Sequence, residues 1–122
     1  MAHILILKTF PDSRGKLTVI EKEIGFPIKR VFYIYDTGPD VVRGGHAHRT
    51  TFHAVICIQG TCEVFADNGV EEKTFVLDSS DKCLILNPED WHTMSKFSPG
   101  CVLLTLASDY YDPDEYVLER HT

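Results

Sequence analysis

The stretch Arg43–Gly60, RGGHAHRTTFHAVICIQG, holds three histidines and two arginines in its first eleven residues and then becomes apolar. Its apolar part, HAVICIQ, is short and rich in β-branched residues, which is typical of a buried strand. His46 and His48 are two residues apart, so on a strand both side chains would point to the same face. Imidazoles just ahead of a buried strand favour one of two functions: a metal site, or acid–base chemistry on a charged ligand.

Short segments of the same kind recur along the chain, and turn sequences separate them. One of these turns, DNG at Asp67–Gly69, is a typical hairpin turn because Asn and Gly tolerate positive φ. About eight strands in 122 residues predict a single all-β domain over residues 1–122, a jelly-roll barrel that can hold one small ligand. The other predicted strand segments are HILILKTF, KLTVIEKE, KRVFYIYDT, TCEVFADN, EEKTFVLDS, DKCLILNP and CVLLTLAS.

The C-terminal segment is the one place where a helix is expected. DPDEYVLERH, residues 112–121, predicts one short helix with Asp112 as N-cap and Pro113 at its first position. The nearby tyrosines Tyr110, Tyr111 and Tyr116 are expected to pack a C-terminal arm on the barrel or on a partner.

Composition excludes several classes of partner. The formal net charge is −6 and no run of Lys or Arg occurs, which argues against nucleic acid. Apolar runs stay far below the roughly 20 residues that span a bilayer, and no secretory signal is found, so we expect a cytoplasmic protein that binds no membrane. The four cysteines form no CxxC pair and lie in or beside apolar runs, which predicts reduced thiols in the core.

The spacing of the histidines resembles the first cupin motif. That motif has two histidines separated by one residue, then a carboxylate, then a glycine. Here His53 stands at the carboxylate position and Gly60 at the glycine position. NPEDWH, with Pro88 and His92, is similar to a remnant of the second cupin motif. This resemblance implies a cupin-type jelly-roll β-barrel, with the C-terminal segment as a short arm or helix.

A longer series of segments, in order from residue 10 to residue 116, is similar to the nucleotide-sugar 3,4-ketoisomerases of the WxcM-like cupins. The resemblance implies conversion of dTDP-4-keto-6-deoxyglucose into its 3-keto isomer, without a metal or other cofactor, on the way to 3-amino-3,6-dideoxy sugars. It also implies a homodimer with an exchanged N-terminal strand. HILIL at residues 3–7 would suit that strand, although it could equally form an ordinary edge. The matching segments are DSRGKLTVIE, IKRVFYIYDT, RGGHAH, CIQGTCEVFADNG, NPEDWHTM and LASDYYDPDEY.

The histidines suit this reaction chemically. Moving a carbonyl from C4 to C3 removes the C3 proton and adds one at C4 through an enediol, and imidazoles can carry these protons. The resemblance makes His46 the expected base at C3. His48 would assist by relaying a proton or polarising the oxygens. Tyr33 is a candidate hydrogen-bond donor to the sugar, but its alternation with Val31 and Tyr35 also fits ordinary packing.

The diphosphate of such a substrate requires arginine, whose guanidinium matches phosphate oxygens. In the resemblance, Arg30 and Arg43 fall where the family contacts phosphate, and Arg14 is a third candidate. Arg30 could instead pair with a surface carboxylate, and Arg14 could simply fix the DSRG turn. Trp91, the only tryptophan, is expected either in a wall of the binding site or in the core.

His53 departs from the family, which usually has glutamine there, whereas metal cupins have glutamate. With His46, His48 and His92 it could hold a transition-metal ion, so a dioxygenase-like four-histidine metal cupin is one alternative. His53 could also line the substrate site. A non-catalytic cupin that binds a sugar nucleotide is the other alternative. The combination of Arg14 with His92 resembles the branch that gives the galacto configuration at C4.

Overall fold

The computed structural model describes residues 1–120. Twelve strands and two single-turn 3₁₀ helices, η1 (Lys22–Ile24) and η2 (Pro113–Glu115), make up its regular structure. The strands are β1 (His3–Ile6), β2 (Thr9–Asp12), β3 (Gly15–Thr18), β4 (Arg30–Ile34), β5 (Arg43–His48), β6 (His53–Gln59), β7 (Cys62–Asp67), β8 (Glu72–Leu77), β9 (Lys82–Leu86), β10 (Trp91–Ser95), β11 (Val102–Ala107) and β12 (Tyr116–Val117).

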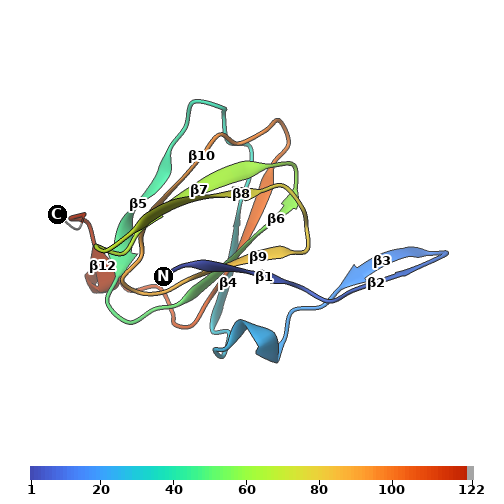
Figure 1. Ribbon diagram of the computed structural model, residues 1–122, viewed down its shortest axis with the longest axis horizontal. Helices are drawn as coiled ribbons and strands as arrows, with labels where there is room; N and C mark the ends of the chain where they lie inside the picture. The colour runs from blue at the N-terminus through green and yellow to red at the C-terminus, as the bar shows by residue number, and fades with distance from the viewer. Residues whose placement is uncertain (121–122) are drawn as a thin grey trace.

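Two five-stranded antiparallel sheets face each other (Figure 1). One has the order β1-β9-β6-β11-β4 and the other the order β12-β5-β10-β7-β8. Val55 and Leu103 from the first sheet and Val64 and Leu77 from the second are buried in the core. This two-layered arrangement confirms the predicted all-β fold of the jelly-roll type.

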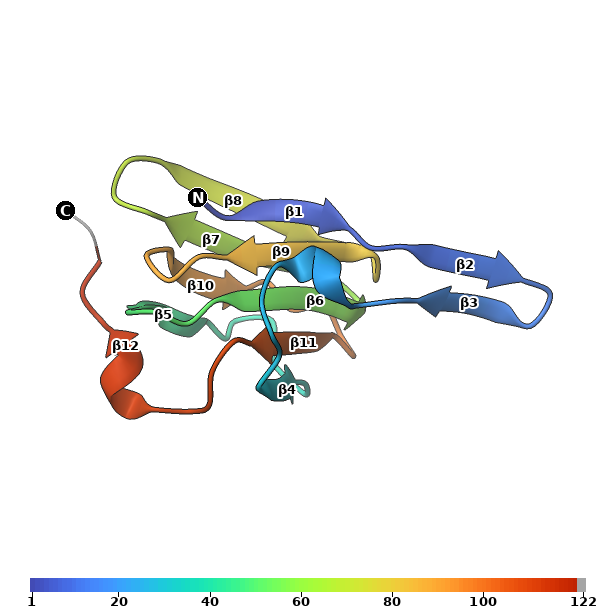
Figure 2. The ribbon, with the colours of Figure 1, turned by 90° about the horizontal axis from the view of Figure 1, so that it is seen from below.

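A separate hairpin of β2 and β3 extends away from the two sheets (Figures 1 and 2). Its strands pair with each other from Thr9–Thr18 to Asp12–Gly15 and join neither large sheet. Phe10 and Leu17 face each other across this hairpin and are both exposed. The hairpin therefore carries apolar surface that the rest of its own chain leaves uncovered.

The turn at Asp67–Gly69 connects β7 to β8, as predicted, and Gly69 has φ of 91°. The predicted C-terminal helix is shorter than expected. Asp112 does cap it, accepting a hydrogen bond from the Asp114 backbone N–H at 3.0 Å, but only residues 113–115 are helical. The next residues pair with β5 as β12, and residue 121 lies outside the described part. Within residues 1–120, no helix has the length and apolar character that crossing a membrane requires.

Candidate active site

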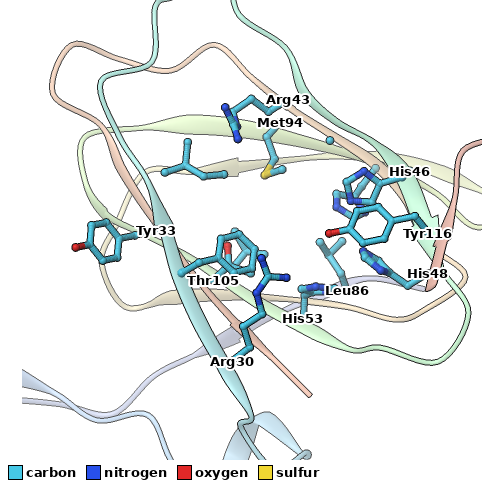
Figure 3. A pocket seen from close by; sticks show the side chains of 15 residues that line it. Arg30, Tyr33, Arg43, His46, His48, His53, Leu86, Met94, Thr105 and Tyr116 are labelled. Atoms are coloured by element: carbon cyan, nitrogen blue, oxygen red, sulfur yellow. The ribbon is translucent and has the colours of Figure 1, made fainter. Parts of the chain in front are cut away.

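Four histidines from three strands meet in a cavity between the two sheets (Figure 3). His46 and His48 come from β5 and His53 from β6, and on β10 His92 lies opposite His46. The ring centroid of His46 lies 4.9 Å from that of His48 and 5.1 Å from that of His92. The ring centroids of His48 and His53 are 4.4 Å apart. The prediction that His46 and His48 share one face is confirmed, because both line this cavity.

Burial keeps these imidazoles uncharged. Desolvation, reinforced by neighbouring histidines, lowers the pKa of His48 to about 3 and that of His53 to about 2. Desolvation also lowers the pKa of His92 to about 4, and it lowers the pKa of His46. At neutral pH each ring is therefore unprotonated, which is the form in which a general base acts.

Hydrogen bonds orient some of these rings and leave others open to a ligand. His92 Nδ1 lies 3.0 Å from the Asp90 carbonyl oxygen. Because a carbonyl oxygen only accepts, Nδ1 carries the proton and Nε2 is the free acceptor. The Nδ1 atoms of His48 and His53 are buried and have no hydrogen-bond partner within residues 1–120. Such atoms are costly unless a ligand supplies the missing bonds.

The same rings also have a geometry that fits a cation. One nitrogen each from His46, His48 and His92 lie within 4.8 Å of one another. Three imidazole nitrogens at such separations are able to bind one transition-metal ion. His53 is not part of this set, so the structure groups three of the four histidines that the sequence put forward.

Tyr116 of β12 also reaches this cavity, a position that its sequence context does not predict. Its ring centroid lies 4.5 Å from that of His46 and 4.8 Å from that of His48. Its phenolic oxygen points into the cavity (Figure 3). The sequence predicts a tyrosine-bearing arm packed on the barrel or on a partner. Only the pairing of Tyr116 with His48 across β12 and β5 shows that the arm forms a wall of the site.

The carboxylate of Glu115 fixes this arm. Its Oε1 accepts hydrogen bonds from the backbone N–H of Thr50 at 2.5 Å and of Thr51 at 2.7 Å, and from both hydroxyl groups. Desolvation opposes ionisation, but these hydrogen bonds outweigh it and lower the pKa of Glu115 to about 2. The neighbouring Tyr116 is thereby held against the histidines.

Two of the three predicted arginines lie at the cavity. Arg30 and Arg43 both line it, and within residues 1–120 neither forms an ion pair. The Arg30 guanidinium instead lies 4.4 Å from the Phe32 ring centroid and 5.3 Å from that of Tyr111. Both positive charges are therefore available to an anionic ligand.

Tyr33 borders the cavity but its side chain points away from the histidines (Figure 3). It is 61% exposed, and its ring lies 5.6 Å from that of Tyr35. Alternation along β4 explains this, because Phe32 and Ile34 face inward and their neighbours face outward. The inward position next to Tyr33 thus carries a phenylalanine, which has no hydroxyl group.

Arg14 and Trp91 lie apart from the cavity lining. Arg14 is at the tip of the β2–β3 hairpin, where its side chain and backbone N–H bond the carboxylate of Asp12, so it fixes the DSRG turn. Trp91 is on the face of β10 opposite to His92, and its ring N–H donates to the Leu118 carbonyl oxygen at 3.2 Å.

Comparisons of sequence and of structure with known proteins point to the same group of proteins. The family model described as "FdtA: WxcM-like, C-terminal" matches residues 1–122. A TDP-4-oxo-6-deoxy-alpha-D-glucose-3,4-oxoisomerase of Aneurinibacillus thermoaerophilus is 43% identical over 116 residues, which cover 93% of this chain and 84% of the relative.

Two crystal structures illustrate the structural similarity. A 3,4-ketoisomerase from Helicobacter canadensis has a TM-score of 0.92 at 40% identity, covering 97% of this chain and 90% of that one. A mutant of the 3,4-ketoisomerase QdtA from Thermoanaerobacterium thermosaccharolyticum, in complex with TDP-4-keto-6-deoxyglucose, has a TM-score of 0.92 at 37% identity. It covers 97% of this chain and 87% of that one.

Proposed function

The chain belongs to the FdtA family of WxcM-like, C-terminal domains, and we propose that it is a 3,4-ketoisomerase of TDP-linked sugars. Its substrate in this proposal is dTDP-4-keto-6-deoxyglucose, and residues 1–122 act as a single catalytic domain. The observation that carries the proposal is the cavity itself. Uncharged histidines and the Tyr116 hydroxyl meet there, and the wall carries two arginines that form no ion pair within residues 1–120.

His46 is the base in the proposed mechanism. It takes the proton from C3, the electron pair of that bond forms a C3–C4 double bond, and the C4 oxygen gains the negative charge. His48, whose ring is adjacent, moves the proton of the C3 hydroxyl to the C4 oxygen. The proton then returns from His46 to C4, and the carbonyl is left at C3. The sugar gains as many protons as it loses and each imidazole ends as it began, so the reaction needs no cofactor. While His46 holds the proton from C3, that proton can exchange with solvent, so C4 can receive a solvent proton.

The enediolate requires hydrogen-bond donors where its negative charge develops. The hydroxyl group of Tyr116 is one such donor, because its oxygen points into the cavity beside His46 and His48. His53 binds a sugar hydroxyl through its Nδ1, which has no hydrogen-bond partner in the described part of the chain. Tyr33 and Trp91 face away from the cavity and have no part in the proposed steps.

The cavity has a volume of about 260 Å³, below the range of about 300–1,000 Å³ that is usual for sites enclosing a drug-sized ligand. It suits the hexose ring, with the nucleotide outside. Arg30 and Arg43 then bind the diphosphate where it leaves the cavity.

We also propose that the enzyme is a homodimer with exchanged N-terminal segments. In the isolated chain β1 pairs with β9 of the same chain, whereas the hairpin beyond it extends outward with Phe10 and Leu17 exposed. Arg14 is at the tip of this hairpin, which extends away from the two sheets (Figure 1), and it is not among the residues that line the cavity of its own chain. In this proposal it binds the substrate of a second copy.

The proposed product has the galacto configuration at C4 and is a precursor of 3-amino-3,6-dideoxy sugars. The face of the enediol that receives the proton at C4 decides this configuration. His92 lies beside His46 inside the cavity and contacts the substrate near C4. Arg14 of the second copy completes this part of the site.

The deciding experiment incubates the purified chain with dTDP-4-keto-6-deoxyglucose in D₂O. We expect deuterium to appear in the sugar, and a 3-aminotransferase to trap a 3-amino product whose C4 configuration NMR can assign. His46→Asn should abolish turnover and leave TDP affinity unchanged. Wild-type protein that binds TDP but exchanges no deuterium with any TDP-4-keto sugar would instead be a binding module.

A metal-dependent enzyme is the second candidate, because nitrogens of His46, His48 and His92 are close enough to share a cation. Elemental analysis of untagged protein distinguishes the two. One transition-metal ion per chain, together with loss of activity on chelation, would replace the cofactor-free mechanism. We expect full ketoisomerase activity after dialysis against EDTA.

A further inference from the structure

A second cluster of ionisable side chains lies near the turn between β6 and β7. Cys57 of β6, Cys62 of β7 and Cys101 directly before β11 are all buried and reduced. Their Sγ atoms all lie within 4.8 Å of one another, and those of Cys57 and Cys101 are 3.4 Å apart. Cys57 is four residues beyond His53 on β6, which is about 13 Å along a strand, so this cluster is separate from the histidines.

Two features of the backbone bring the three thiols together. The turn between β6 and β7 contains Gly60 with φ of 76°, and a Cβ there would lie 3.0 Å from Cys101 Cα and 2.5 Å from Ser98 Oγ. Only glycine lets the turn approach the Cys101 segment so closely. In addition, the pairing of β11 with β6 shifts register between Val102 and Leu103, and such a bulge redirects the neighbouring side chains.

We propose that Cys57, Cys62 and Cys101 bind one soft d¹⁰ cation, of the Zn²⁺ or Cu⁺ class, through three thiolates. In the plane of three sulfur atoms with these separations, the point equidistant from all three lies at most about 2.6 Å from each, close to the Zn–S distance of about 2.3 Å. Thiolate is the ligand that soft cations prefer. Binding displaces the thiol protons, which pass to the solvent.

The cation has a route to this site and an effect on the fold. Cys101 borders a surface groove of about 300 Å³ that Asp36, Gln59 and Gly100 also line. A cation that entered there would link the β6–β7 turn to the start of β11. Because the unfolded chain lacks the assembled site, binding should stabilise the folded protein.

The test titrates Cd²⁺ into protein that is kept reduced by a phosphine and freed of metal with EDTA. We expect one equivalent to produce thiolate-to-metal charge-transfer absorption and to raise Tm. Imidazole gives no such absorption, so Cd²⁺ at the histidines cannot mimic the result. Zn²⁺ and Cu⁺ are then compared as competitors that abolish the Cd²⁺ absorption, which identifies the preferred ion.

Cys62→Ser should weaken Cd²⁺ binding at least 100-fold. Cys83→Ser is the matched control, because Cys83 is equally buried but packs in a different core cluster with Ile24 and Ile56. Its binding should equal that of the wild type. If the Cys62 variant does not fold, cadmium NMR of the wild type decides, because the shift separates sulfur from nitrogen coordination. Absence of the charge-transfer absorption, its persistence in folded Cys62→Ser, or a shift typical of nitrogen ligands alone would overturn the proposal.

Discussion

At the scale of single residues, the buried histidines connect the site to the stability of the protein. His48, His53 and His92 have pKa values of about 3, 2 and 4 in the folded chain, against 6.5 for an ordinary histidine. Between the folded-state pKa of each histidine and pH 6.5, the unfolded chain binds more protons than the folded one. Stability therefore rises with pH through this window and is lost as pH falls.

This linkage predicts that acidification from pH 6.5 towards pH 4 lowers the free energy of unfolding, by up to about 1.4 kcal/mol per pH unit for each buried histidine. Urea denaturation at a series of pH values measures the slope. His53→Gln should reduce the slope by the share of one histidine, and His3→Gln, at an exposed position, should not change it. Equal slopes for wild type and His53→Gln would contradict the assignment.

Tyr116 is the residue whose role is most directly testable. Tyr116→Phe removes only the hydroxyl that points into the cavity, so kcat should fall about 10²-fold, the usual effect of losing one donor to a developing oxyanion. TDP affinity should stay unchanged, because the phosphate contacts are left intact. Tyr110→Phe is the control, since Tyr110 is 69% exposed and lies outside the cavity lining. Unchanged kcat in Tyr116→Phe would remove the tyrosine from the mechanism.

At the scale of elements, β12 depends on the anchor of one carboxylate. Glu115→Ala removes every hydrogen bond to Thr50 and Thr51 that Oε1 accepts, so the two-residue strand β12 should detach from β5 part of the time. We expect faster hydrogen exchange at the Val117 amide and at least a tenfold lower kcat. Glu119→Ala, at an exposed position on the same arm, should match the wild type. Slow exchange at Val117 with normal kcat in the Glu115 variant would show that the arm needs no such anchor.

Sequence patterns located the strands that carry their own signal and missed those that depend on distant partners. The apolar segments gave β6 and β11 directly. HILILKTF was expected as one strand, but it divides into β1 and β2, because the Leu7 amide bonds Asp81 and the chain then leaves the sheet. WHTMS shows no apolar alternation, and only its pairing with β5 and β7 makes it β10.

In the site, too, residues with a local sequence signal were predictable, whereas residues placed by distant parts of the chain were not. The two-residue spacing of His46 and His48 was enough to place both in one cavity, because alternation along a strand is a local property. The segment RVFYIYD makes Tyr33 a candidate, but the register of β4 turns its side chain outward. Tyr116 comes from almost 70 residues beyond His48, so no spacing rule could have brought it to the cavity.

At the scale of the whole molecule, the role of Arg14 depends on whether two chains associate. Arg14 lies at the tip of the hairpin that extends away from the two sheets (Figure 1) and does not line the cavity of its own chain, so a role in substrate binding requires a second chain. This predicts that Arg14→Ala and His46→Asn complement each other in mixed dimers. In a mixed dimer, one site combines the intact His46 of one chain with the intact Arg14 of the other. The second site carries both substitutions.

Co-expression of the two variants gives about half mixed dimers if the chains associate at random. We therefore expect about a quarter of wild-type activity, well above the mean of the two pure variants, measured as deuterium incorporation from D₂O. Lys16→Ala, which changes a cation on the same hairpin, should keep full activity as a homodimer. If Arg14 acted within its own chain, every site in the mixed dimer would carry one defect, and activity would not exceed the mean of the parents. That result would leave Arg14 only its role in the turn, where it already bonds Asp12.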